Sequence, residues 1–172
     1  DLLISNDPQK TFQLATELNN YNTKRQKIES ILLEEVDLQA KQNLDNPVLV
    51  LSGEDWHEGV IGIVASKIKD KYNKPTILIS LNKDIGKGSA RSVVGFDVGS
   101  QIIKAVQSNI LEKGGGHKMA GGFVIKKEKI QLFRDLLIKN YEVYKNVINL
   151  MTNYFMLKSK NVFFLFSSFP SS

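Results

Sequence analysis

The sequence predicts an α/β protein with a small mixed sheet of about four to five strands, flanked by helices and preceded by a long connecting helix. Residues 8–43 contain no helix breaker. Two apolar runs, 48–51 and 76–81, enclose an amphipathic helical segment, which is the pattern of a strand–helix–strand unit. Strand-like and helix-like segments then continue to alternate along the chain. We therefore expect three parts: a connector helix in 1–45, an α/β domain in 46–147 and an atypical tail in 148–172.

The composition is that of an ordinary globular chain with a mild positive charge. Its 172 residues include 23 Lys and Arg against 18 Asp and Glu, and the net charge of +5 is compatible with nucleic-acid binding. Cysteine is absent, which excludes disulfides, thiolate metal ligands and a thiol nucleophile. No apolar run reaches the ~20 residues of a membrane span. We expect a cytoplasmic protein without a membrane partner.

A long helix is expected at the start of the chain. Asp7 is a good N-cap and Pro8 suits the first helical position, while Asn46-Pro47 ends the helical region. Apolar residues recur at three- and four-residue spacing from Leu14 to Leu32, which gives one narrow stripe. The segment is one helix, or two helices joined near residues 19–22. We favour a helix that bridges two lobes over a hairpin packed on a single core.

A strand–helix–strand unit follows the connector. The runs 48–51 and 76–81 are continuously apolar, as in strands buried on both faces. The helix between them, 60–72, has a buried face formed by Ile61, Val64, Ala65 and Ile68. The two strands should be parallel and joined by a right-handed crossover.

The remaining elements are two strands and two helices. Residues 87–93 form a more polar strand, and 122–126 form a fourth strand. Asp97 should cap a helix that runs from 98 to about 113, and a final amphipathic helix spans 128 to about 146. We expect the buried side of the first of these helices to be Ile102, Ile103, Val106, Ile110 and Leu111.

The last stretch, residues 151–172, differs from the rest of the chain. Five of the nine phenylalanines lie in it, and it has no clear helical or strand period. Either it packs on an edge of the domain, or it is a poorly structured segment that does not belong to the ancestral fold. We favour the second interpretation.

The glycine run Gly114, Gly115 and Gly116, followed by His117, is the first candidate site. Consecutive glycines allow backbone N–H groups to converge on an anion, and a histidine beside them can supply a proton donor. The pattern predicts a phosphate cradle with an imidazole at its rim. The alternative is a flexible turn with a surface histidine.

Ser89, Arg91 and Ser92 form the second candidate, in the polar strand. Alternation places Ser89 and Arg91 on one face, where a guanidinium and a hydroxyl can hold a phosphate together. The alternative is an edge-strand arginine in solvent.

Trp56 and His57 form the third candidate, in a loop before a helix. His57 can meet an anion at the helix N-terminus, and Trp56 offers a flat face for a base. The alternative is that Trp56 plugs the core and His57 is its polar neighbour.

No metal site is expected in this chain. It has two histidines, which lie far apart in sequence, and its acidic residues are mostly on helix surfaces beside lysines. It also has no P-loop and no recognisable Ser-His-Asp arrangement.

Several segments resemble the C-terminal half of the bacterial RecJ single-strand-specific DNA exonucleases, which belong to the DHH phosphoesterase superfamily. The long helix resembles the one that joins the two RecJ lobes. The glycine–histidine signature alone is shared across the superfamily, whereas the Trp-His and Gly-Ser-Ala-Arg-Ser segments narrow the resemblance to RecJ. The tail does not match. The matching segments are 56–67, 74–75, 86–92, 95–97, 114–117 and 120–123.

The resemblance implies a DHH-associated, substrate-binding lobe of a 5′-to-3′ exonuclease of DNA repair and recombination, with single-stranded DNA and the Asp-His-His lobe as partners. Ser89 and Arg91 would hold a phosphate, Gly114–Gly116 would donate to a phosphate, and His117 would stabilise transition-state charge. Manganese or magnesium would bind in the other lobe, so we expect this chain to be inactive alone. The alternatives are a lobe of a related oligonucleotide or cyclic-dinucleotide phosphodiesterase, and an inactive gene fragment.

Overall fold

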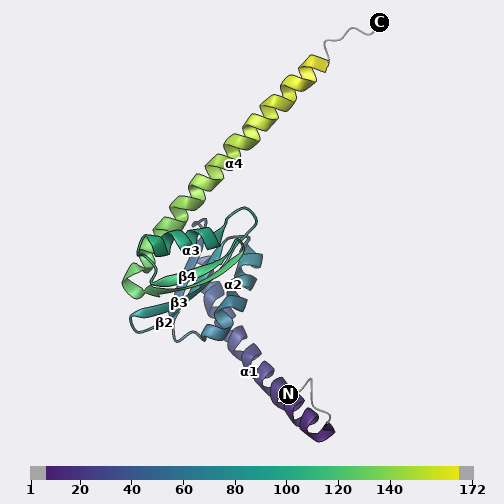
Figure 1. Cartoon of the computed structure of the whole chain (residues 1–172), viewed down its shortest axis with the longest axis vertical. Coiled ribbons are helices and arrows are strands. Elements are labelled where there is room, and N and C mark those ends of the chain that lie inside the picture. Colours follow the sequence, from purple (N-terminus) through teal and green to yellow (C-terminus); the bar gives the residue numbers. More distant parts are fainter. Residues whose placement is uncertain (1–6, 167–172) are drawn as a thin grey trace.

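The computed structural model describes residues 7–166 and has three layers, with a mixed five-stranded sheet between two pairs of helices (Figure 1). This confirms the predicted fold class. Within these residues no helix combines the length and the apolarity needed to cross a membrane. The elements are α1 (Pro8–Lys41), β1 (Leu49–Glu54), α2 (Glu58–Tyr72), β2 (Thr76–Asn82), β3 (Ile85–Arg91), α3 (Val98–Gln107), β4 (Lys113–His117), β5 (Ala120–Lys126), a 3-10 turn (Lys127–Lys129) and α4 (Ile130–Phe166).

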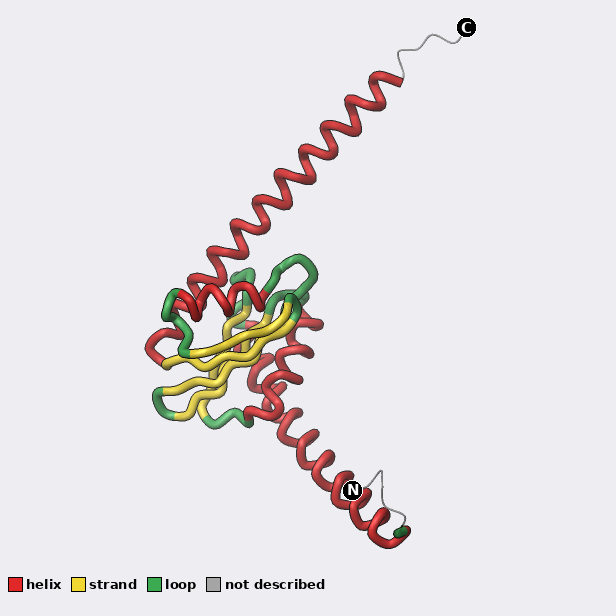
Figure 2. Tube along the Cα trace, in the orientation of Figure 1, coloured by secondary structure: helices red, strands yellow, loops and turns green. Residues whose placement is uncertain are grey.

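The sheet, whose strands are yellow in Figure 2, has the strand order β1-β2-β3-β5-β4. β1 and β2 are parallel and α2 connects them, as the strand–helix–strand pattern predicts. The other pairs, β2–β3, β3–β5 and β5–β4, are antiparallel. β4 is therefore an edge strand, and the hairpin that it forms with β5 places His117 at the end of the sheet.

The two faces of the sheet are covered to different extents. On one face α1 and α2 enclose a core with Leu49, Leu51, Trp56 and Leu78. On the other face α3 and α4 pack on Phe123 and Ile125 among others. Because α2 packs on β2 and β3, it leaves the same face of β5 and β4 uncovered.

α1 is a single helix, which decides between the two interpretations of this segment. Asp7 caps it by accepting hydrogen bonds from the backbone N–H groups of Gln9 and Lys10. Only its second half packs against α2, through Leu32, Val36 and Ala40. Its first half projects from the domain and exposes Leu18 and Tyr21 of the predicted stripe (Figure 1).

α3 is shorter than expected. It ends at Gln107 because Asn109 adopts a left-handed conformation that turns the chain back. Ile110 and Leu111 still enter the core, and their N–H groups bond to the carbonyl of Ala105. The prediction that Ile103 is buried is wrong, since 46% of this residue is exposed.

α4 is longer than expected and projects far beyond the domain (Figure 1). The structure differs from the expected poorly structured segment at 151–172, because the backbone continues as a helix as far as residue 166. Short helical stretches of polar residues and phenylalanines can extend an already nucleated helix without a clear apolar period. Residues 167–172 lie outside the described part of the chain.

Candidate functional site

The uncovered part of the α2 side of the sheet, here called the open face, consists of three rows of side chains across β3, β5 and β4. Strand register and alternation define these rows. The first row is Arg91, Ala120 and His117; the second is Ser89, Gly122 and Gly115; the third is Lys87, Val124 and Lys113. The middle row is almost free of side chains, so its backbone is accessible.

Arg91 is half-buried and held in a defined position on the open face. Its Nη1 donates to the Ser89 hydroxyl at 3.1 Å and to the carbonyl of Ala90 at 2.8 Å. α2 approaches from the side, and a Cβ on Gly62 would lie 2.9 Å from Nη2 of Arg91 and 3.0 Å from Oγ of Ser89. The predicted pairing of Ser89 with Arg91 on one face is therefore confirmed, and the guanidinium fits there because Gly62 has no side chain.

His117 occupies the other end of the Arg91 row, with the small Ala120 between them. Two strand spacings of about 4.8 Å separate the backbones of Arg91 and His117. The side chain of His117 is exposed. In the strand register, Ala120 therefore lies between Arg91 and His117 on the open face.

The backbone around His117 is firmly anchored. The turn of the β4–β5 hairpin is formed by Lys118 and Met119, whose carbonyls accept hydrogen bonds from the N–H groups of Val98 and Ser92 at 3.1 and 2.9 Å. Gly99 lies so close that a Cβ there would be 2.7 Å from the carbonyl oxygen of His117. The first turn of α3 thus fixes the position of His117.

Asp97 stabilises this first turn of α3, as predicted. Its Oδ1 accepts the backbone N–H of Ser100 at 2.9 Å, and its Oδ2 accepts the Ser100 hydroxyl at 2.9 Å. These hydrogen bonds to the charged form, with the backbone N–H contributing most, lower the pKa of the Asp97 carboxyl.

The glycine run does not form the predicted cradle. Gly114, Gly115 and Gly116 are extended residues of β4, and none has the positive φ that converging N–H groups require. They alternate instead: Cβ atoms on Gly114 and Gly116 would collide with α3 or β5, whereas a Cβ on Gly115 would meet nothing within 4 Å. The alternative of a flexible turn is also wrong, since the turn lies at Lys118 and Met119.

Two other predicted site residues are structural. Ser92 is buried, and its hydroxyl donates to the carbonyl of Phe96 at 2.6 Å, so it cannot hold a phosphate. Trp56 is buried against Gly53, and its Nε1 donates to Glu35 at 3.0 Å. The prediction that Trp56 stacks on a base is wrong, because only 6% of the residue is exposed and its side chain belongs to the core between α1, α2 and the sheet.

His57 is the N-cap of α2. Its Nδ1 accepts the backbone N–H of Gly59 at 3.1 Å, so the neutral imidazole carries its proton on Nε2. The exposed Nε2–H is left as a donor. A role for His57 in substrate binding stays a prediction.

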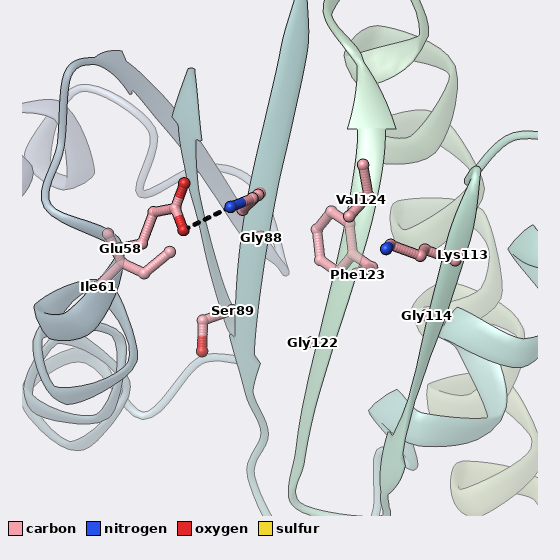
Figure 3. A pocket seen from close by; sticks show the side chains of 10 residues that line it. Glu58, Ile61, Gly88, Ser89, Lys113, Gly114, Gly122, Phe123 and Val124 are labelled. Carbon is pink, nitrogen blue, oxygen red and sulfur yellow. Dashed lines mark hydrogen bonds and ion pairs between the residues drawn. The ribbon is translucent and has the colours of Figure 1, made fainter. Parts of the chain in front are cut away.

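A cavity of about 480 Å³ continues the open face away from Arg91 (Figure 3). Glu58 and Ile61 of α2 border it on one side and Lys113 of β4 on the other, with Ser89, Gly122 and Val124 between them. Neither the lysines nor Glu58 was among the predicted site residues. Because side chains alternate along a strand, Lys87 lies on the same face as Ser89 and Arg91 and could have been predicted from the sequence.

The described residues provide no metal centre. Among residues 7–152, whose side chains are described, no three His, Asp or Glu side chains lie together in a way that could hold an ion. Manganese or magnesium therefore does not fit this part of the chain.

Comparisons with known proteins support the sequence resemblance. The family profile of the DHHA1 domain matches residues 45–142, more than half of the chain. The chain is 37% identical over 139 residues to the single-stranded-DNA-specific exonuclease RecJ of Bacillus subtilis strain 168, covering 79% of this chain and 17% of that protein. It is 36% identical over 146 residues to the same-named protein of Haemophilus influenzae, and the match covers 79% of this chain and 25% of that protein.

The fold also matches a solved structure. RecJ of Thermus thermophilus, in complex with Mn²⁺, superposes with a TM-score of 0.72 at 29% identity, covering 80% of this chain and 20% of that one. These matches confirm the resemblance to RecJ. The chain spans about a quarter of the length of these proteins or less.

Proposed function

The chain belongs to the DHHA1 domain family, and from this premise we propose that it is the substrate-binding part of a RecJ-type single-stranded-DNA exonuclease. On this proposal it holds the DNA strand while a separate lobe of the DHH type cleaves the phosphodiester bond. A cytoplasmic location and a role in DNA repair and recombination stay predictions that accompany this proposal.

The observation that carries the proposal is the position of Arg91. Its guanidinium is oriented by Ser89 and Ala90 and packed against Gly62, beside a row in which Ser89 is followed by two glycines. A phosphate needs two or three such donors on one side and free space on the other. The open face supplies both, because Gly122 and Gly115 leave the backbone bare next to the Ser89 hydroxyl.

His117 completes the proposed site from the edge strand. It faces the same space as Arg91 across Ala120, and α3 fixes its backbone. An imidazole N–H there can donate to a phosphate oxygen and stabilise negative charge that develops during cleavage. Arg91 and Ser89 orient the strand, and His117 acts on the phosphate next to them.

We also propose that the ions of the reaction, Mn²⁺ or Mg²⁺, are held by a partner lobe of the DHH type. The donor set described here does not fit a divalent metal. The contribution of this chain is then to bind and orient the strand, and we expect it to be inactive alone.

Binding of a 5′-phosphorylated single-stranded DNA tests this function. Wild type should bind with an affinity that falls with salt, and both Arg91→Ala and His117→Ala should weaken binding. Lys104→Ala is the matched control, because Lys104 lies on α3, on the other side of the sheet. Equal affinity of all four proteins would refute the proposed site.

The length of the nucleic acid that binds most tightly distinguishes a single-stranded-DNA exonuclease from a phosphodiesterase of small substrates. Tighter binding of a dinucleotide or cyclic dinucleotide than of a long strand would indicate a phosphodiesterase of small substrates within the same superfamily. Absence of any binding by a folded sample would mean that the chain binds DNA only with the other lobe attached, or that it is an inactive fragment.

A further inference from the structure

The lysine row of the open face, Lys87, Val124 and Lys113, lies far enough from Arg91 to contact a different part of a bound strand. Lys87 and Arg91 are four residues apart in β3, a distance of about 13 Å along the strand direction. Lys113 and His117 have the same separation in β4. The bare middle row, which contains Ser89 and two glycines, connects the two ends.

The cavity at the lysine row combines a charged rim with an apolar base. Ile61 and Val124 supply the apolar surface, and Lys113 and Glu58 supply charges (Figure 3). Lys87 also lines the cavity and adds a positive charge. A groove that follows a polyanionic backbone needs cations at its rim, while a sugar or base edge packs well on aliphatic side chains. A small anion alone would not use the apolar surface.

The two lysines differ in their availability. Within the described part of the chain, the side chain of Lys113 makes no hydrogen bond or ion pair. Nζ of Lys87 is 2.8 Å from the Glu58 carboxylate, with 57% and 50% of the two side chains exposed. An ion pair in solvent is weak and exchanges readily. Glu58 therefore restrains Lys87 and also places a negative charge beside the path of a phosphate.

We propose that this cavity is a second contact site for the strand, in which Lys113 binds a phosphate and Glu58 limits affinity by holding Lys87. The proposal rests on the proposed function and extends it from one phosphate to a strand segment. The strand lies along β3 and β5, with one phosphate between Arg91 and His117 and a later one at the lysine row.

The test compares a 5′-phosphorylated oligothymidylate of about eight nucleotides with thymidine 5′-monophosphate, on the full 172-residue chain. Lys113→Gln should weaken oligonucleotide binding about fivefold at low salt and lower the salt slope by about 0.7, and should leave the mononucleotide unaffected. Glu58→Gln should tighten oligonucleotide binding about twofold to fivefold, because it frees Lys87 and removes a repulsion.

Two control variants make the same Lys-to-Gln and Glu-to-Gln changes at positions outside the cavity. Lys104→Gln removes a positive charge on α3. Glu54→Gln breaks the exposed ion pair with Lys127, whose atoms are 2.6 Å apart, and Glu54 does not line the cavity. Neither control should change the ratio of oligonucleotide to mononucleotide affinity.

The outcomes separate this inference from the function on which it rests. Effects of Lys113→Gln and Glu58→Gln that equal those of the controls, with Arg91→Ala still weakening both ligands, would overturn the second site alone. If Arg91→Ala weakens binding of neither the oligonucleotide nor the mononucleotide, the proposed function and the second site are overturned together.

Discussion

The guanidinium of Arg91 lies directly against the backbone of Gly62, such that a Cβ on Gly62 would be 2.9 Å from Nη2. Gly62→Ala should therefore displace the arginine without disturbing the backbone, because the long side chain of arginine can shift. Because alanine is a better helix former than glycine, the substitution should keep or raise stability by up to about 1 kcal/mol. Binding of single-stranded DNA should weaken at the same time. Thermal unfolding and a binding titration check the two effects.

Gly59→Ala is the matched control for this experiment. Gly59 lies one turn earlier in α2, and its Cβ would contact the His57 ring, with the nearest atom at 3.1 Å. It should leave Arg91 in place, so any effect of Gly59→Ala on DNA affinity would report on His57. DNA affinity that is unchanged in Gly62→Ala would show that the position of the guanidinium does not matter.

Gly115 and Gly116 of β4 should respond differently to substitution. Gly115→Val should keep the stability of the sheet, because β-branched residues favour strands and nothing lies within 4 Å, but it should fill the open face and weaken DNA binding. Gly116→Ala should destabilise by about 1–3 kcal/mol, since its Cβ would be 2.4 Å from the carbonyl oxygen of Ala120. A converging cradle would instead make both substitutions equally harmful to binding; urea denaturation and DNA titration of the two variants distinguish these cases.

Ser89 and Ser92 form a second matched pair, from one strand and the turn that follows it. Ser92→Ala should cost about 1 kcal/mol of unfolding free energy, because it removes a buried hydrogen bond to Phe96, and should not change DNA affinity. Ser89→Ala should weaken DNA binding and leave the unfolding free energy nearly unchanged, because the half-buried Ser89 hydroxyl orients Arg91. Comparable losses of affinity in both variants would contradict the separation of the two roles.

The elements with strong local signals were predictable from the sequence. Asp7 and Asp97 cap helices as expected, and the buried face of α2 is the expected one. What was missed depends on tertiary context. Whether Trp56 stacks on a ligand or plugs a core is decided by Glu35 and Gly53, which are brought to it by the fold.

The same holds for the site. Glycines favour both a nest and a strand, and only pairing with β5 and the close approach of α3 make Gly114–Gly116 extended. Ser89 and Arg91 were found because alternation along one strand is a local property. The same alternation also places Lys87 on this face, but its proximity to Lys113 depends on the register of β3, β5 and β4.

The last prediction concerns Glu29, a buried carboxylate that joins α1 to α2. It lies 2.6 Å from Nζ of Lys67 and 2.6 Å from Nη1 of Arg25. The hydrogen bond from Lys67, with the charges of Lys67 and Arg25, holds the pKa of Glu29 below its ordinary value of 4.5, although burial opposes this. Because the pKa is lower in the folded state, the stabilisation is present above about pH 4.5 and is lost as the pH falls through the folded-state pKa.

Glu29→Gln should therefore lower the melting temperature at pH 7 and reduce the part of the acid-induced destabilisation that begins below about pH 4.5. Glu34→Gln is the control, because Glu34 is exposed on the same helix. The difference in melting temperature between wild type and Glu29→Gln should shrink as the pH falls, while that for Glu34→Gln stays small throughout. A difference that is constant with pH would mean that Glu29 acts through packing and not through its charge.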